Sequence, residues 1–225
     1  MRNNVFVISQ CSLTHLQMIV AAYDLALEQV GRDIRSSWIW ISYIEYLKGL
    51  RLSDATADLR RQDEIRKLFF RALGNPMDNL DSIWNEFYNY ERNRSGSSYE
   101  SSVEDRRKSL NDSKTVYKRR KELMQQLITN GSYARPPRGT RKERRQLQLW
   151  QELIAYEKTN PQNLNSQELH DRIAYTFNMA LEPMYHFTSI WYMSAMYEVE
   201  TEDLDAAFKV FARGIAALPN NMMLS

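Results

Sequence analysis

Aromatic and apolar side chains recur at helical spacing in four segments of the chain. One segment places Trp84, Phe87 and Tyr90 three residues apart, and Glu91 follows directly. Spacings of three and six residues bring side chains onto one stripe of a helix. The pattern predicts a repeated helix whose aromatic residues lie in the core and whose glutamate is structural. The other copies are Trp40/Tyr43/Tyr46, Trp150/Leu153/Tyr156 with Glu157, and Trp191/Ser194/Tyr197 with Glu198.

A second pattern lies between these segments and combines an apolar, an aromatic and a small residue with a leucine. Ile65, Phe69, Ala72 and Leu73 form one copy, and Pro76 follows it, where a helix cannot continue. The small residue lets a helix approach its neighbour closely, so we expect a second helix packed on the first. Further copies are Ile19/Tyr23/Ala26/Leu27, closed by Gly31, Ile173/Phe177/Ala180/Leu181, and the looser Ala207/Phe211/Gly214/Ile215, followed by Pro219.

The two patterns alternate and so predict a unit made of a helical hairpin. Stacked hairpins form a solenoid, and the sequence predicts an all-α protein, a right-handed α-α superhelix in which residues 1–225 are a single array of about five partial or complete repeats. Residues 1–18 lack the aromatic triplet of a first helix, which predicts a divergent or truncated start. We expect polar connectors at 49–63, 93–102 and 130–140, and one long helix over 103–130.

The composition suits such an array. The chain has 225 residues, of which 26% are charged, with only seven glycines and six prolines. Cys11 is the single cysteine, which excludes an internal disulfide. The uncharged stretch at 3–22 contains several polar residues and predicts neither a signal peptide nor a membrane span, so we expect an intracellular protein without membrane contact.

The formal net charge of +2 conceals a strong asymmetry along the chain. Residues 1–91 carry 10 basic and 12 acidic side chains, residues 92–145 carry 16 and 6, and residues 146–225 carry 4 and 10. The middle segment could be a solvated helix face, a surface that docks an acidic protein, or a surface that contacts RNA phosphates. Its candidate docking residues are Arg106, Arg107, Lys108, Lys118, Arg119, Arg120, Lys121, Arg141, Lys142, Arg144 and Arg145.

Trp38 lies outside the repeated pattern. It stands two residues before Trp40 and so points to another side of the helix, which makes it the best candidate for an exposed aromatic anchor. Tyr117 and Tyr133 are the aromatic residues of the basic segment that could stack on RNA bases. Tyr117 stands at helical spacing from leucines, and this spacing favours a core position.

Residue sets that would support catalysis are missing from the sequence. His15, His170 and His186 are scattered, and none of them forms a zinc-binding pair on a helix turn. The chain has no glycine-rich phosphate loop and no nucleophile elbow around a serine. We expect a protein that is not an enzyme and that uses no cofactor and no metal.

The serial order of several short motifs resembles the half-a-TPR repeat and, more specifically, the suppressor-of-forked family, the family of the largest scaffold subunit of cleavage stimulation factor. The order and the uneven spacing of the motifs both fit this family over about residues 19–225. The motifs are Ile39-Trp40-x-x-Tyr43-Ile44, Asn75-Pro76-Met77, Tyr90-Glu91, Pro136-Pro137, Glu157-Lys158-x-Asn160-Pro161, Ile190-Trp191-Tyr192 and Ala217-Leu218-Pro219-Asn220.

The resemblance implies a nuclear scaffold for pre-mRNA 3′-end cleavage and polyadenylation. Members of the family carry two arrays of repeats and dimerise through the C-terminal one, so this chain would be the N-terminal array and mainly monomeric. Its implied partners are proteins of the processing machinery, with mostly indirect contact to pre-mRNA. Two alternatives stay open: a scaffold of another RNA-processing assembly, such as the spliceosome or the ribosomal-RNA machinery, and a direct RNA-binding module.

Overall fold

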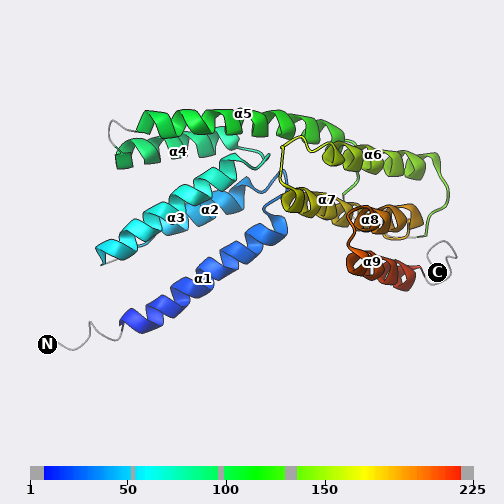
Figure 1. Cartoon of the computed structure of the whole chain (residues 1–225), viewed down its shortest axis with the longest axis horizontal. Coiled ribbons are helices and arrows are strands. Elements are labelled where there is room, and N and C mark those ends of the chain that lie inside the picture. Colours follow the sequence, from blue (N-terminus) through cyan, green and yellow to red (C-terminus); the bar gives the residue numbers. More distant parts are fainter. Residues whose placement is uncertain (1–7, 52–53, 96–98, 130–135, 219–225) are drawn as a thin grey trace. The chain divides into compact units, whose positions relative to one another are not determined.

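The computed structural model describes residues 8–51, 54–95, 99–129 and 136–218. The described residues form nine α-helices and no strand (Figure 1), which confirms the all-α prediction. The repeated aromatic and glutamate positions fall on helices, and the turns between helices fall at the proline and polar segments. The helices are α1 (Ile8–Val30), α2 (Ser37–Gly49), α3 (Ala55–Leu73), α4 (Leu80–Ser95), α5 (Tyr99–Met124), α6 (Arg141–Lys158), α7 (Ser166–Leu181), α8 (Thr188–Glu200) and α9 (Leu204–Ala217).

The chain divides into two compact units at a point within α5. Unit 1 comprises residues 1–118 and unit 2 comprises residues 119–225. Each unit has its own cluster of buried hydrophobic residues. That residues 1–225 act as a single array stays a prediction.

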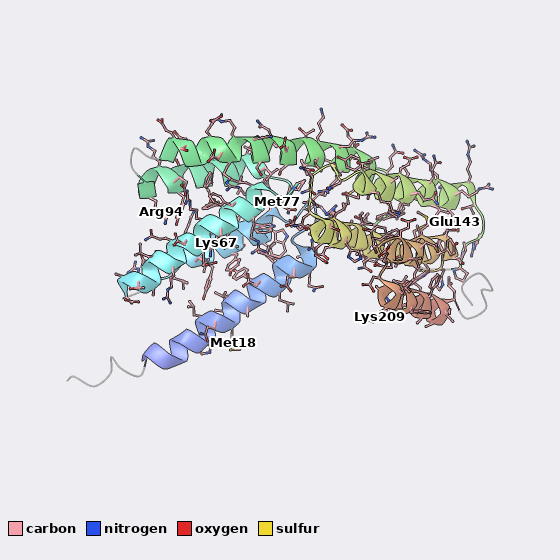
Figure 2. All side chains as sticks on the ribbon, viewed as in Figure 1. Met18, Lys67, Met77, Arg94, Glu143 and Lys209 are labelled. Carbon is pink, nitrogen blue, oxygen red and sulfur yellow. The ribbon has the colours of Figure 1, made fainter. Side chains whose placement is uncertain are left out.

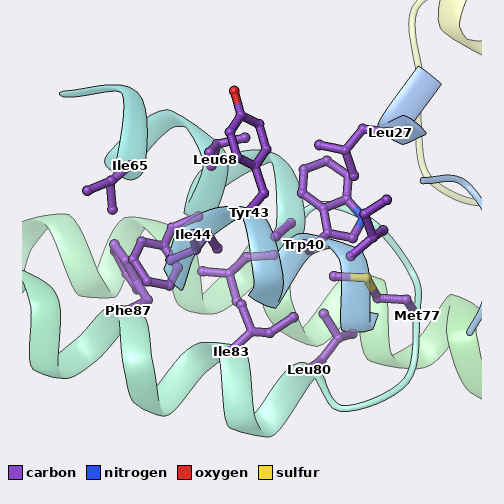
Figure 3. Packing of buried hydrophobic residues seen from close by; sticks show 14 of the residues in the cluster. Leu27, Trp40, Tyr43, Ile44, Ile65, Leu68, Met77, Leu80, Ile83 and Phe87 are labelled. Carbon is purple, nitrogen blue, oxygen red and sulfur yellow. The ribbon is translucent and has the colours of Figure 1, made fainter. Parts of the chain in front are cut away.

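The core of unit 1 is formed by the aromatic positions of the repeat (Figure 3). The ring of Tyr43 on α2 stacks on that of Tyr23 on α1, with ring centroids 4.7 Å apart. The ring of Phe69 on α3 lies 5.7 Å from that of Phe87 and 5.5 Å from that of Tyr90, both on α4. Residues from the first-helix and second-helix patterns therefore pack on one another, as the hairpin prediction requires.

The core of unit 2 is centred on two tryptophans of the repeat. Trp150 on α6 is fully buried and Trp191 on α8 is 2% exposed. The indole nitrogen of Trp191 donates a hydrogen bond of 2.8 Å to the backbone oxygen of Tyr185. Phe177 of α7 packs in the same cluster. Burial of such large rings supplies much of the favourable free energy of folding.

Trp84 differs from the other tryptophans of the repeat because it is only partly buried. Its ring lies 5.8 Å from that of Phe87 on one side. On another side it is covered by the guanidinium of Arg107 on α5, 5.7 Å from the ring centroid. The expectation of a buried Trp84 therefore holds in part: the ring packs against the core of unit 1, but it stays partly exposed beside Arg107.

The first connector is shorter than predicted. Asp54 accepts hydrogen bonds from the backbone nitrogens of Thr56 and Ala57 and caps α3, which begins at Ala55. The polar residues after it lie within α3, where Arg61 donates from one nitrogen to the backbone oxygens of Leu47 and Lys48 at the end of α2. The prediction of a connector over 49–63 is thus wrong. Residues from Ala55 onward are helical, and Arg61 among them hydrogen-bonds to the backbone at the end of α2.

One other boundary also shifts. The long helix runs from Tyr99 to Met124 rather than over 103–130. Helix α1 begins at Ile8, and residues 1–7 lie outside the described part. That residues 1–18 are a divergent or truncated start stays a prediction. Pro219 and Tyr133 also lie outside the described residues.

Candidate docking surface

The repeated glutamates lie in the interior and each bonds to a basic or histidine side chain. Glu91 is fully buried and accepts two hydrogen bonds from the guanidinium of Arg66, at 2.9 and 3.1 Å. Glu198 is 5% exposed and lies 2.7 Å from Nε2 of His170. These carboxylates join consecutive helices, α3 to α4 and α7 to α8, and are not available to a partner.

Glu157 has two cationic partners and the most enclosed site of the three. Both of its oxygens accept hydrogen bonds of 2.7 Å from Arg120 on α5, and Oε1 also accepts one of 3.2 Å from Arg172 on α7. Arg120 further donates to Gln162 at 2.5 Å. Burial alone would raise the pKa of Glu157, but the hydrogen bonds from Arg120 and the charge of Arg172 outweigh it and lower the pKa.

Arg120 therefore does not belong to a docking surface, and its prediction as a surface residue is wrong. Its side chain is 1% exposed. Val116, four residues earlier on α5, is buried, so Arg120 stands on the buried stripe of that helix. Burial and the nearby charge of Arg172 lower the pKa of Arg120, while Glu157 opposes them, so the arginine acts as an internal structural cation.

The basic residues of α5 within unit 1 divide between packing and solvent. The guanidinium of Arg106 lies 3.9 Å from the ring centroid of Phe70, and Arg107 covers Trp84 and pairs with Glu104. These two side chains shield aromatic rings of the unit 1 core. Lys108 and Lys118 are exposed.

In unit 2, the exposed cations gather at the start of α6. The first turns of that helix carry four basic side chains, which are all exposed: Arg141, Lys142, Arg144 and Arg145. We call these four residues the α6 basic cluster. Arg145 lies 3.6 Å from Glu152, and that carboxylate is itself exposed.

The helix that carries this cluster is firmly capped. The side chain of Thr140 accepts from the backbone nitrogen of Glu143, and the Glu143 carboxylate accepts from the backbone nitrogens of Thr140 and Arg138. The bond from Thr140, above all, lowers the pKa of Glu143 and outweighs its burial. Figure 2 shows Glu143 at the first turn of α6. Its carboxylate is therefore engaged by the backbone.

Positive side chains at this place are electrostatically unfavourable for the helix itself. The amino end of a helix carries a partial positive charge, so each added cation costs up to about 1 kcal/mol there. Clustered cations at a helix start also produce a strongly positive local field that favours an anionic partner. Of the described surface, the start of α6 best fits the predicted docking of an acidic group.

The remaining predicted docking residues of unit 2 lie on α5, at some distance from this cluster. Arg119 is exposed and pairs with Glu122 at 3.3 Å, and Lys121 is exposed. The pair of Arg120 with Glu157 places this end of α5 beside the end of α6, twelve residues or about 18 Å along the helix from Arg145. Within unit 2, the predicted docking residues thus do not form one continuous patch.

Trp38 is exposed, and it lies in unit 1. Its side chain is 63% exposed on α2. The nearby Arg35 is exposed as well and hydrogen-bonds to Asp33. The position fits the anchor role expected from the sequence, and that role stays a prediction.

The described residues were compared with the requirements of a metal site and of a membrane-spanning helix. No group of three or more histidine, cysteine, aspartate or glutamate residues is placed to hold a metal ion in that part of the chain. His170 stacks on the ring of Tyr197, with centroids 5.7 Å apart, while it bonds to Glu198. None of the described helices combines the length and the apolar character needed to cross a membrane.

The fold and this surface define an all-helical repeat protein with a charged face, a class that binds other macromolecules. The family model described as Suppressor of forked protein (Suf) matches residues 2–225. The chain belongs to the suppressor-of-forked family.

Individual relatives agree with this family. The chain is 32% identical over 203 residues to the Arabidopsis thaliana protein named Cleavage stimulation factor subunit 77, covering 90% of this chain and 28% of the relative. It is 27% identical over 185 residues to Protein suppressor of forked of Drosophila melanogaster, covering 82% and 24%. The chain thus spans about a quarter of the length of these relatives.

A solved structure shares the fold. The crystal structure of CstF-77 superposes with a TM-score of 0.71 and 21% sequence identity, over 90% of this chain and 41% of the other. At this identity the likeness concerns the fold alone. It supports the hairpin arrangement deduced from the aromatic and glutamate positions.

Proposed function

We propose that the chain is the N-terminal repeat region of a non-catalytic scaffold in nuclear pre-mRNA 3′-end cleavage and polyadenylation. The observation that carries the proposal is the family match over residues 2–225, together with relatives named as a cleavage stimulation factor subunit and as mRNA 3′-end-processing proteins. A scaffold needs exposed contact surface rather than reactive groups, and the α6 basic cluster provides such a surface.

The docking role of the α6 basic cluster follows from its charge and its setting. The rigid capped helix holds Arg141, Lys142, Arg144 and Arg145 in fixed order, so little conformational entropy of the backbone is lost on binding. An acidic segment of a protein partner would meet four cations and the positive end of a helix. We therefore assign the cluster to an acidic protein of the processing complex, with contact to RNA mostly indirect.

The isolated chain should be mainly monomeric in this proposal. The resemblance to the family attributes self-association to a C-terminal array of repeats, and we match these 225 residues to the N-terminal one. The α6 basic cluster would then be accessible to partners whether or not the C-terminal array dimerises.

Affinity purification from nuclear extract tests the proposal. The tagged chain should retain 3′-end-processing proteins, and the charge reversal Arg144→Glu with Arg145→Glu should reduce their recovery. The reversal of two exposed arginines of unit 1, Arg51→Glu with Arg60→Glu, is the matched control and should leave recovery unchanged.

Two results would contradict the proposal. Retention of splicing or ribosomal-RNA factors without any 3′-end-processing protein would assign the scaffold to another assembly. Direct RNA binding that is lost with the Arg144→Glu and Arg145→Glu reversal, and that falls steeply with salt, would assign the cluster to RNA instead.

A further inference from the structure

The segment that leads into α6 holds an exposed threonine between basic side chains. Residues 136–140 are exposed and lie outside any helix, and Thr140 ends the segment with an extended backbone. Arg138 stands two residues before Thr140 and Lys142 two residues after it, and both are exposed. An exposed hydroxyl between cations, on a segment outside regular structure, suits the acidic substrate groove of a protein kinase that selects basic residues.

The hydroxyl of Thr140 accepts a hydrogen bond, and this leaves its hydrogen available for transfer. Its oxygen accepts from the backbone nitrogen of Glu143 at 3.2 Å. A hydroxyl that donates to the backbone instead engages the hydrogen that a kinase must remove. Four other threonines donate in this way to a backbone oxygen three or four residues earlier: Thr115, Thr159, Thr176 and Thr201.

A second basic run shows what the structure adds to the sequence. Ser109 directly follows three basic residues at 106–108, so its sequence also suits a kinase that selects basic residues. However, it lies in the interior of α5 and is only partly exposed. Its hydroxyl oxygen lies 3.7 Å from the place of a Cβ added at Gly74, so the side chain faces the end of α3. The structure therefore favours Thr140 over Ser109 as the acceptor.

Only the first turn of α6 has to open for a kinase to bind the Thr140 segment. Arg141 and Lys142 lie in that turn, and residues 136–140 are already non-helical. The terminal turn of a helix opens more readily than its interior, because fewer contacts are lost. At Ser109, in contrast, α5 would have to unfold on both sides of the acceptor.

A phosphate on Thr140 would lie among more cations than anions. Residues 138–145 hold five basic side chains and one acidic side chain, Glu143, which gives a net charge of +4. A phosphothreonine carries about −1.5 to −2 charges at neutral pH, so it would roughly halve that net charge. Arg144 stands four residues after Thr140, on the same side of the helix start, where its guanidinium can pair with the phosphate. A cation that pairs within the chain no longer attracts an acidic partner.

We propose that Thr140 is a phosphorylation site, and that its phosphate pairs with Arg144 and weakens docking at the α6 basic cluster. The threonine oxygen forms a bond to the γ-phosphorus of ATP, the bond from that phosphorus to the bridging oxygen breaks, and ADP leaves with the electron pair. The hydroxyl proton passes to a carboxylate of the kinase. The effect on docking rests on the proposed function, whereas the acceptance of phosphate by Thr140 does not.

Phosphorylation of the folded 225-residue chain tests the site. The reagents are ATP, magnesium and the catalytic domain of protein kinase C, which selects basic residues on both sides of its acceptor, and mass spectrometry locates the phosphate. Thr140 should be labelled faster than Ser109 in the folded chain, whereas synthetic peptides of residues 104–115 and 136–147 should both be labelled. Thr140→Asn keeps a helix-capping side chain but has no hydroxyl, so it should remove most of the incorporated phosphate.

Two measurements on the phosphorylated chain test the effect of the phosphate. A fluorescent glutamate-rich peptide, followed by anisotropy at low salt, should bind at least about fivefold more weakly than it binds the unmodified chain. Thr140→Asn treated with the same kinase should bind this peptide as the unmodified chain does. In a ³¹P NMR titration, pairing with Arg144 should lower the pKa of the phosphate below its usual value of about 6, and Arg144→Gln should raise that pKa again.

Four outcomes would overturn the proposal. They are no phosphate on Thr140 of the folded chain, labelling of Ser109 at the same rate, unchanged peptide binding after phosphorylation, and a phosphate pKa that Arg144→Gln leaves unchanged. Failure of the proposed function gives a different result. If the glutamate-rich peptide does not bind the unmodified chain, docking at the α6 basic cluster fails and its control by phosphate fails with it, while labelling of Thr140 still establishes the site.

Discussion

Replacing Glu157 by glutamine should destabilise unit 2 by about 3–5 kcal/mol. The amide keeps the size of the side chain but removes the anion that two arginines share. The side chains of Arg120, Glu157 and Arg172 are 1%, 1% and 5% exposed, so water cannot replace the lost charge. Two cations would then face each other in the interior, with Gln162 as a neutral acceptor for one of them.

Glu91 provides an internal comparison. It occupies the same place in the repeat, but it has the partly exposed Arg66, whose side chain is 33% exposed. Water can solvate that guanidinium when its carboxylate is removed, so Glu91→Gln should cost only about 1–3 kcal/mol. The predicted loss of stability is therefore clearly larger for Glu157→Gln than for Glu91→Gln.

Urea unfolding followed by circular dichroism measures both changes. Hydrogen exchange then assigns each loss to its unit: Glu157→Gln should speed exchange in α6 and α7, and Glu91→Gln in α3 and α4. The reasoning would be refuted if the two variants lost equal stability, or if Glu157→Gln cost less than about 1 kcal/mol.

Three other predictions follow from burial and charge. Trp150→Ala should lower the free energy of unfolding by about 3–5 kcal/mol, whereas Trp38→Ala should change it by under about 0.5 kcal/mol, as denaturation curves would show. Burial, with the charge of Asp24, raises the pKa of Tyr43 from its ordinary value of 10.0 to about 12. The stability that Tyr43 contributes is therefore complete below pH 10.0 and lost as the pH rises through about 12, and Tyr43→Phe should remove that alkaline loss in thermal melts. The folded-state pKa of Glu157 is depressed below 4.5, so its contribution should be present above that pH and disappear as pH falls through the folded pKa, and this acid loss should be smaller in Glu157→Gln.

The sequence predicts most of the helices because their core positions repeat. Trp150, Phe177 and Trp191 each stand at helical spacing from other apolar residues of their own helix. The structure buries all three. The start of α3 was harder to predict, because the polar residues after Asp54 suit a loop as well as a solvated helix. Only the contact of Arg61 with the end of α2 shows why that run is helical.

The surface was harder to predict than the core. A run of basic residues in a sequence does not show which of them is buried. Arg120 is buried because it pairs with Glu157, which lies thirty-seven residues later in the chain. Its distance of four residues from Val116 was the available signal, yet charge normally argues against a buried position. The capping by Thr140 and Glu143, in contrast, is visible as a threonine followed three residues later by a glutamate.

The exposure of Phe208 on α9 illustrates the same limit. Phe208 stands one residue after the repeated apolar position, where the sequence pattern makes no demand. That its side chain is 71% exposed becomes clear only from the structure.

Competition in a cleavage assay tests the central claim most directly. An excess of the purified chain, added to nuclear extract of the source organism, should inhibit cleavage of a pre-mRNA at its polyadenylation site and leave splicing of a second substrate intact. The Arg144→Glu and Arg145→Glu variant should inhibit much less, and the Arg51→Glu and Arg60→Glu control should inhibit as the original chain does. Inhibition of splicing with cleavage unaffected would contradict the account.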